Sequence, residues 1–100
     1  MSFELSEEII NNLRSVLEKF KVVEKAVIFG SRARGDQRYN SDIDIAVYTN
    51  GAPIPGLSLE IDDAAGIYKT NVVVIAEITN QNFLKNITSD GVEFYQRNKA

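Results

Sequence analysis

Two carboxylates separated by one apolar residue, Asp42 and Asp44, are the side chains of this sequence best spaced to do chemistry. Residues at i and i+2 of a strand point to the same face, with their Cα atoms roughly 6.5–7 Å apart, so the two carboxylates can converge. Two neighbouring anions repel each other unless a positive charge lies between them. Because the chain has no histidine and no cysteine, a divalent cation held by oxygen ligands is the simplest candidate.

A phosphate-binding pattern, GSRARG, lies shortly upstream at residues 30–35. Gly30 has no side chain, so the backbone can approach a ligand closely. A helical turn that begins at Ser31 would offer backbone N–H groups to an anion. The guanidinium groups of Arg32 and Arg34 would add positive charge. The sequence therefore predicts phosphate binding at the end of one strand and metal binding at the start of the next.

Each of these residues also has an ordinary structural interpretation. Asp42 and Asp44 are compatible with a solvated strand start, and surface arginines are commonly solvated or paired with a carboxylate. The glycine-serine turn upstream favours the functional interpretation of the two acids. For Arg32 and Arg34, phosphate contact and plain surface solvation remain equally weighted alternatives.

Hydrophobic periodicity predicts the elements that position these residues. Apolar residues that recur every four positions predict a helix over residues 6–20, with Ser6 as its N-cap. The apolar run 26–29 predicts a buried central strand that ends at Gly30. Residues 41–48 alternate, which predicts a second strand that carries both acids near its start, on the face opposite its large apolar side chains.

The second half of the chain continues this alternation of helices and strands. The elements expected are a loop over 49–56, a helix over about 57–67, a strand over 71–78, a short helix capped by Thr79, and an edge strand or helical turn over 92–95. The tail over 97–100 is expected to fray. The pattern predicts a single α+β domain over residues 1–100, with helices packed on a mixed sheet.

Composition narrows the classes of function. The chain has 100 residues, 44% hydrophobic and 25% charged, which is typical of a globular domain. Its net charge of −3 gives no support for a basic face, so we expect no long nucleic acid as a partner. Acidic residues at the start argue against a signal peptide, and no apolar run approaches the ~20 residues of a membrane span. We therefore expect a cytoplasmic protein with no membrane association.

The double motif GSRARG and SDID, at residues 30–35 and 41–44, resembles the signature of the DNA polymerase β-like nucleotidyltransferase superfamily. It looks most like the minimal nucleotidyltransferase group (MNT, MntA-type), and the resemblance covers nearly the whole chain. It implies the nucleotidyltransferase fold and transfer of a nucleoside monophosphate, expected to be AMP from ATP, to an acceptor hydroxyl with pyrophosphate leaving.

The resemblance also implies roles for individual residues. Gly30 and Ser31 would hold the β- and γ-phosphates of a nucleoside triphosphate. Asp42 and Asp44 would be the catalytic ligands of Mg²⁺, with Mn²⁺ as an alternative metal. The assignment of Arg32 and Arg34 to nucleotide binding rests on their positive charge beside this turn and not on the resemblance.

One position departs from the family pattern. The family has a third carboxylate on the next strand, where this chain has Asn71. An amide offers a neutral oxygen, but it cannot accept a proton as a general base and it adds no negative charge. Glu77 lies six residues further along, ~20 Å away if the strand is straight, and is not expected to substitute. A catalytically weakened or inactive subunit is therefore the alternative to an active enzyme.

Partners are implied by the resemblance alone. Minimal members are often paired with a small helical protein of the HEPN type, so such a partner is expected, with a homodimer as the alternative. Three hypotheses follow: an Mg²⁺-dependent transferase that adenylylates its partner or another acceptor, an antitoxin-like subunit that acts by contact, and a nucleotide sensor without turnover.

Overall fold

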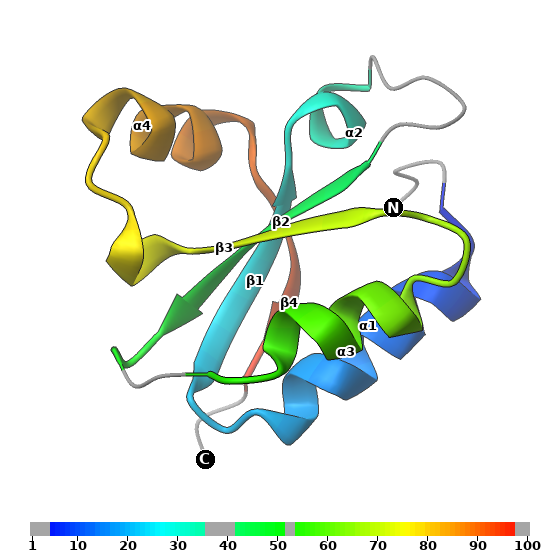
Figure 1. The fold of residues 1–100 in the computed structure, drawn as a ribbon. Helices are drawn as coiled ribbons and strands as arrows, with labels where there is room; N and C mark the ends of the chain where they lie inside the picture. Colours follow the sequence, from blue (N-terminus) through cyan, green and yellow to red (C-terminus); the bar gives the residue numbers. More distant parts are fainter. Residues whose placement is uncertain (1–4, 36–41, 52–53, 98–100) are drawn as a thin grey trace.

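The computed structural model describes residues 5–35, 42–51 and 54–97, which form a four-stranded sheet with helices on both faces (Figure 1). In chain order the elements are α1 (Glu7–Lys19), β1 (Val23–Phe29), α2 (Ser31–Arg34), β2 (Ile43–Thr49), α3 (Leu57–Ala64), β3 (Thr70–Val74), the 3₁₀ helix η1 (Ile75–Glu77), α4 (Gln81–Asp90) and β4 (Val92–Gln96). The predicted α+β class is confirmed. Within the described ranges, no helix is long and apolar enough to cross a membrane.

The topology of the sheet brings three chain segments to one of its ends. The strand order is β3-β2-β1-β4, with β1 antiparallel to β2 and β4, and with β2 parallel to β3. Because β1 and β2 are antiparallel, the end of β1 and the start of β2 lie together. Because α3 provides the crossover between parallel strands, the start of β3 lies there as well. Gly30, Asp44 and the first residues of β3 are thereby neighbours.

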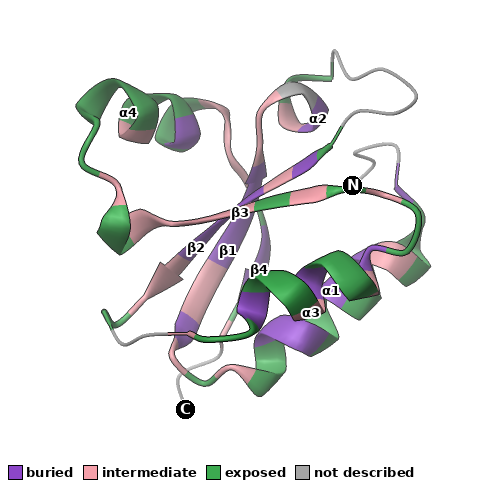
Figure 2. Ribbon diagram, viewed as in Figure 1, coloured by how far each residue is buried: buried purple, intermediate pink, exposed green. Residues whose placement is uncertain are grey.

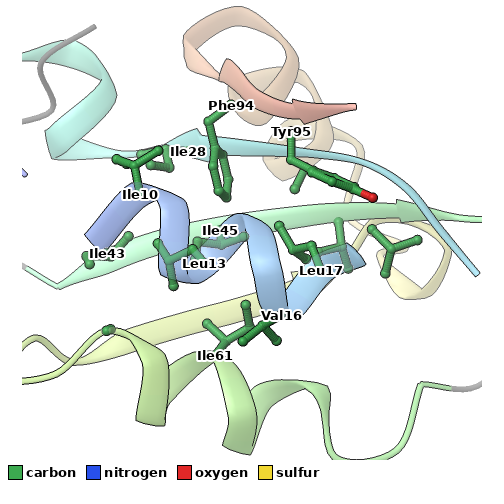
Figure 3. Close-up of a cluster of buried hydrophobic side chains, with 14 of the residues drawn as sticks. Ile10, Leu13, Val16, Leu17, Ile28, Ile43, Ile45, Ile61, Phe94 and Tyr95 are labelled. Atoms are coloured by element: carbon green, nitrogen blue, oxygen red, sulfur yellow. The ribbon is translucent and has the colours of Figure 1, made fainter. Parts of the chain in front are cut away.

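The main hydrophobic core lies between the sheet and the helices α1 and α3 (Figure 3). Ile43, Ile45 and Val47 of β2 are fully buried on this face, as the alternation in the sequence predicts. A smaller cluster of Val27, Ala46 and Ile87 lies on the opposite face, under α4. Figure 2 shows the resulting contrast between the buried interior of the sheet and the exposed outer surfaces of the helices. Side chains that alternate with the main-core residues of β2 therefore point to the α4 face.

Several predicted boundaries are corrected by the structure. Strand β1 begins at Val23 and not at residue 26, because it pairs along its length with β2. Strand β3 ends at Val74, where the chain turns into η1, and α3 ends at Ala64. Helix α4 is capped by Asn80 and not by Thr79, since the Asn80 side chain accepts a hydrogen bond from the Phe83 backbone at 3.0 Å.

Three further predictions concern the ends of the expected elements. Residues 92–96 form an edge strand, which confirms the first of the two alternatives for this segment. Helix α1 begins after Ser6, whose hydroxyl accepts a hydrogen bond from the Ile9 N–H, as predicted for its N-cap. Ser41, predicted as the first residue of the second strand, lies outside the described residues, and β2 is described from Ile43.

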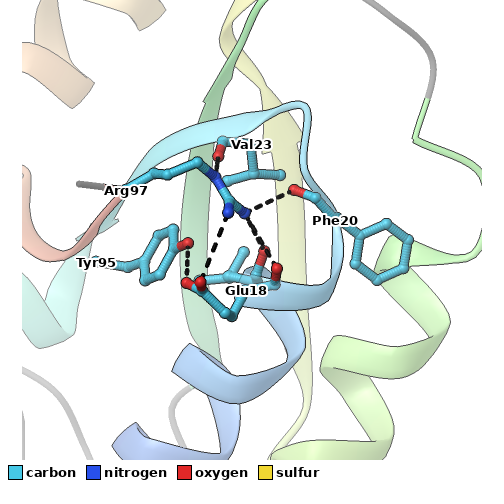
Figure 4. Close-up of polar contacts among 6 residues, drawn as sticks. Glu18, Phe20, Val23, Tyr95 and Arg97 are labelled. Atoms are coloured by element: carbon cyan, nitrogen blue, oxygen red, sulfur yellow. Dashed lines mark hydrogen bonds and ion pairs between the residues drawn. The ribbon is translucent and has the colours of Figure 1, made fainter. Parts of the chain in front are cut away.

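The expectation that the chain frays from Arg97 onward is wrong for Arg97 itself. Its Nε donates to the Val23 carbonyl at 2.9 Å (Figure 4). Its Nη2 donates to the carbonyls of Leu17 and Glu18, both at 3.2 Å, and of Phe20 at 3.1 Å. These carbonyls lie at the end of α1, in the following turn and at the start of β1, where the guanidinium adds to the backbone hydrogen bonds that Leu17 and Phe20 already accept. Arg97 thereby fastens the end of β4 to α1, whereas residues 98–100 lie outside the described part of the chain.

Tyr95 reinforces the same junction between β4 and α1. Its hydroxyl donates to the Glu18 carboxylate at 2.6 Å. Burial, together with this hydrogen bond, raises the pKa of Tyr95 to about 12. The phenol is therefore a protonated donor throughout the neutral pH range, and the contact is maintained there.

Replacing Arg97 should measurably destabilise the fold. Arg97→Met keeps much of the aliphatic stem but removes the hydrogen bonds that the guanidinium donates to four backbone carbonyls. We expect the free energy of unfolding to fall by about 1–3 kcal/mol, measured by urea denaturation. Lys85→Met, an equivalent change at an exposed position of α4, is the control and should change stability by less than about 0.5 kcal/mol. Equal stability of the two variants would contradict this account of the helix end.

Candidate functional site

The register of the sheet places Asp44 between two other site residues. On β2, Asp44 is the Cα partner of Phe29 in β1 and of Asn71 in β3. Gly30 follows Phe29 directly, and Asp42 precedes the first residue of β2. Both acids and Asn71 therefore meet at the end of the sheet. Because Asp44 alternates with the main-core residues of β2, this site lies on the α4 face.

The Asn71 amide bridges the two carboxylates. Its Nδ2 donates to Asp42 Oδ2 at 3.2 Å and to Asp44 Oδ1 at 3.0 Å. The two oxygens thus converge on a single NH₂ group, whose hydrogens carry partial positive charge, and a cation placed there would neutralise them. Glu77 lies in η1, beyond the far end of β3, and the structure does not bring it to the acids. The residue of β3 nearest the acids is Asn71.

The backbone conformation at position 30 and the nearby Asp44 carboxylate both require glycine there. Its φ of +74° lies in the left-handed region, which disfavours other residues. A Cβ atom added there would lie 2.4 Å from Asp44 Oδ2. The Asp44 carboxylate is therefore held between the Gly30 backbone on one side and the Asn71 amide on the other. An anion bound along the Gly30 backbone would lie directly beside this carboxylate, so a bridging cation would be needed between the two charges.

The close contact at Gly30 predicts a large effect of a single added methyl group. Gly30→Ala should cost roughly 1–2 kcal/mol from the left-handed backbone, plus the displacement of Asp44. Gly35→Ala is the matched control, because its φ is +84° but nothing lies within 4 Å of an added Cβ. We expect Gly30→Ala to lower the unfolding free energy more than Gly35→Ala in urea denaturation. Equal losses would show that Asp44 is free to move away.

The two arginines of the turn lie in different environments. Arg32 is 3% exposed, and its guanidinium carbon lies 5.0 Å from the centroid of the Tyr68 ring. Arg34 is exposed, and its Nη1 lies 3.4 Å from Asp90 Oδ2 at the end of α4. The predicted phosphate contacts of both arginines stay predictions. Neither Tyr68 nor Asp90 was identified as a neighbour of the site from the sequence, since neither has a local signal that marks such a contact.

The donor atoms present suit a hard divalent cation. The described residues contain no group of three or more histidine, cysteine or acidic side chains that could hold a metal. Two converging carboxylates nevertheless suffice for Mg²⁺, which commonly takes one or two protein carboxylates and completes its coordination with water and substrate phosphates. All the available donors are oxygens, which also fits Mn²⁺ and disfavours softer metals. Asp42, Asp44 and the amide oxygen of Asn71 are the groups that could hold such an ion.

Comparison with protein families identifies a match over most of the chain. The family described as polymerase β nucleotidyltransferase matches residues 11–100, a span that includes Gly30, both acids and Asn71. A search of curated proteins finds no match.

Solved structures with a similar fold include toxin–antitoxin complexes. A toxin–antitoxin crystallised with AMP-PNP matches with a TM-score of 0.75 and 20% identity, over 88% of this chain and 73% of the other. A tri-AMPylated HEPN toxin in complex with an MNT antitoxin, from Shewanella oneidensis, gives 0.68 and 16%, over 89% and 71%. A putative nucleotidyltransferase from Sulfolobus solfataricus gives 0.56 and 27%, over 88% and 77%. At these identities the toxin–antitoxin matches establish a shared fold.

Proposed function

We propose an adenylyl-transfer function for this chain, which belongs to the polymerase β nucleotidyltransferase family. In the proposed reaction, an acceptor hydroxyl oxygen bonds to the α-phosphorus of ATP, the bond to pyrophosphate breaks, and the hydroxyl proton is released. The observation that carries the proposal is the convergence of Asp42 and Asp44 beside the Gly30 backbone. The family typically uses a divalent metal, and this donor set fits Mg²⁺ or Mn²⁺.

The residues of the site would divide the work of binding and positioning. Gly30 and Ser31 would contact the β- and γ-phosphates, and the exposed guanidinium of Arg34 would supply positive charge. Asp42 and Asp44 would hold the metal, which when bound neutralises phosphate charge and orients the triphosphate. Asn71 would release its hydrogen bonds to the acids and offer its amide oxygen, but it cannot accept the hydroxyl proton.

The proposed acceptor is a small helical protein of the HEPN type. Two observations support this choice: the fold matches MNT antitoxins in complex with toxins, and one of those HEPN toxins is tri-AMPylated. A homodimer in which a second copy provides the acceptor is the alternative assembly.

Asn71 favours a second candidate function. In that alternative the chain binds a nucleotide without efficient transfer, or neutralises a helical partner by contact, as an antitoxin-like subunit. The specific observation is that the position beside Asp44 on β3 holds an amide and not a carboxylate. Such a site retains charge for metal binding while it lacks a proton acceptor at that position.

Calorimetric titration with ATP, with and without Mg²⁺, tests the shared premise of both functions. We expect binding that requires Mg²⁺, for the chain alone or in complex with the protein that co-purifies with it. Incubation of that complex with ATP labelled at the α-phosphate then separates the two functions. Label transferred to the partner, with release of pyrophosphate, supports the transferase. Magnesium-dependent binding without label transfer supports the second function, and the absence of binding in both preparations would refute the proposal.

A further inference from the structure

Arg32 is an unusual residue for a phosphate-binding turn because it is buried. At 3% exposure, it is the one charged or polar side chain classed as buried among the residues that the structure describes. Removing a guanidinium from water is costly unless its surroundings compensate. A side chain in this position cannot make a bidentate contact with a triphosphate that arrives from solvent unless it first leaves its packed site.

One contact of Arg32 joins the turn to the segment that precedes β3. Its guanidinium carbon lies 5.0 Å from the centroid of the Tyr68 ring, within the range of a cation–π interaction. Tyr68 lies between α3 and β3, directly before Lys69, whose carbonyl accepts a hydrogen bond from the Ile43 N–H at 2.9 Å. Asn71 follows two residues after Lys69. The stack therefore joins the 30–35 turn to the segment that enters β3 and supports the start of β2.

Arg34 provides the contrast within the same four-residue helix. Its side chain is 48% exposed and pairs with Asp90, which is itself partly exposed. Solvent reaches this guanidinium, and exposed ion pairs of this kind contribute little to stability and exchange readily. Of the two arginines, Arg34 is accordingly the one that a phosphate group can reach.

We propose that Arg32 is a positioning residue and not a phosphate contact. Its stack on Tyr68 sets the distance between the Gly30 backbone, where phosphate would bind, and the acids on β2 with Asn71 on β3. This inference rests on the proposed function, because its main consequence is a change in affinity for ATP with Mg²⁺. Loss of the stack would let the turn shift away from Asp44, although every proposed ligand of phosphate and metal is still present.

Lysine substitution separates the two roles of Arg32. Arg32→Lys keeps the positive charge but loses the planar group that stacks on an aromatic ring. A positioning role predicts that Arg32→Lys weakens ATP binding as much as Arg32→Met does, by about tenfold in Kd, measured by calorimetry with Mg²⁺. A phosphate contact made through charge alone predicts that Arg32→Lys retains most of the affinity, whereas a bidentate phosphate contact, which lysine also loses, is distinguished from positioning by the Tyr68 variants. Retention of wild-type affinity by the lysine variant would overturn the inference.

Tyr68 provides an independent arm of the experiment. Tyr68→Leu removes the ring and should reproduce the loss seen in Arg32→Met, although no part of Tyr68 is proposed to touch the nucleotide. Because both substitutions break one contact, their effects on affinity should not add in the double variant. Tyr68→Phe, which keeps the ring, is expected to retain most of the wild-type affinity for ATP. Additive losses in the double variant would contradict a shared positioning role.

Two further measurements keep a general loss of stability apart from a loss of position. Arg97→Met, destabilised at the opposite end of the sheet, should bind ATP normally at a temperature where it is folded.

Hydrogen exchange of the unliganded protein tests the stack without any nucleotide. In Arg32→Lys, the backbone amides over 30–34 and 69–71 should both exchange faster than in the wild type. If wild-type protein does not bind ATP, the proposed function fails, and unchanged exchange in Arg32→Lys would refute the positioning role separately.

Discussion

Asp44→Asn is expected to abolish the magnesium-dependent component of ATP binding. Asp44 provides one of two converging carboxylates and is held in place by Gly30 and Asn71. The amide keeps the size of the side chain but removes the negative charge that a hard cation requires. We expect the affinity for ATP with Mg²⁺ to fall roughly 100-fold or more, equivalent to about 2.7 kcal/mol, and any transfer activity to disappear with it.

The thermal stability of the same variant gives a second readout. In EDTA, Asp44→Asn should be as stable as the wild type or more stable, because the repulsion between Asp42 and residue 44 is removed. Added Mg²⁺ should raise the midpoint temperature of the wild type but not of the variant, since a ligand stabilises only the state that binds it. Asp63→Asn, which removes the same charge from an exposed position of α3, is the matched control and should behave as the wild type. Magnesium-dependent binding that survives in Asp44→Asn would refute the assignment of the metal site.

Asn71→Asp is expected to have opposite effects with and without metal. In EDTA the variant loses both hydrogen bonds donated by Nδ2 and places a third negative charge beside two others. We expect a loss of about 1–3 kcal/mol of unfolding free energy, measured by urea denaturation in EDTA. With Mg²⁺ the loss should be recovered, because a third carboxylate strengthens cation binding and relieves the repulsion.

The catalytic consequence of Asn71→Asp distinguishes the two proposed functions. If the lack of a proton acceptor limits transfer, the rate of label transfer from α-labelled ATP should rise by roughly 100-fold, the usual scale of general-base catalysis. Asn86→Asp, the same change at an exposed position of α4, controls for added charge and should leave the rate unchanged. A variant that is insensitive to Mg²⁺ and unaltered in EDTA would show that Asn71 does not belong to the metal site.

The bridging amide also reduces the repulsion between the two acids at this end of the sheet. Each carboxylate accepts one hydrogen bond from the same nitrogen, so some of their mutual repulsion is offset by the amide dipole. An aspartate at this position could not do this. Asparagine in place of aspartate at position 71 therefore makes the stability of the site less dependent on metal. The same change leaves the site without a proton acceptor at this position.

The local features of the fold were available from the sequence alone because they depend on short-range periodicity. The N-cap at Ser6, the apolar face of α1 and the alternation along β2 follow from the geometry of helices and strands. The pairing of a glycine turn with two acids also lies within fifteen residues, so its chemistry could be inferred directly. Boundaries were less determined, since Thr79 and Asn80 are both competent caps by residue type and only the structure shows that Asn80 caps α4.

Only the tertiary structure decided which distant residues complete the site. Asn71 lies 29 residues from Asp42, and only the parallel register of β2 and β3 brings its amide to both acids. Two other features likewise depend on contacts between separate elements: the burial of Arg32 against Tyr68, and the hydrogen bonds from Arg97 to the end of α1. Local sequence cannot encode these contacts by itself, because register and side-chain burial are set by how the whole sheet closes around its core.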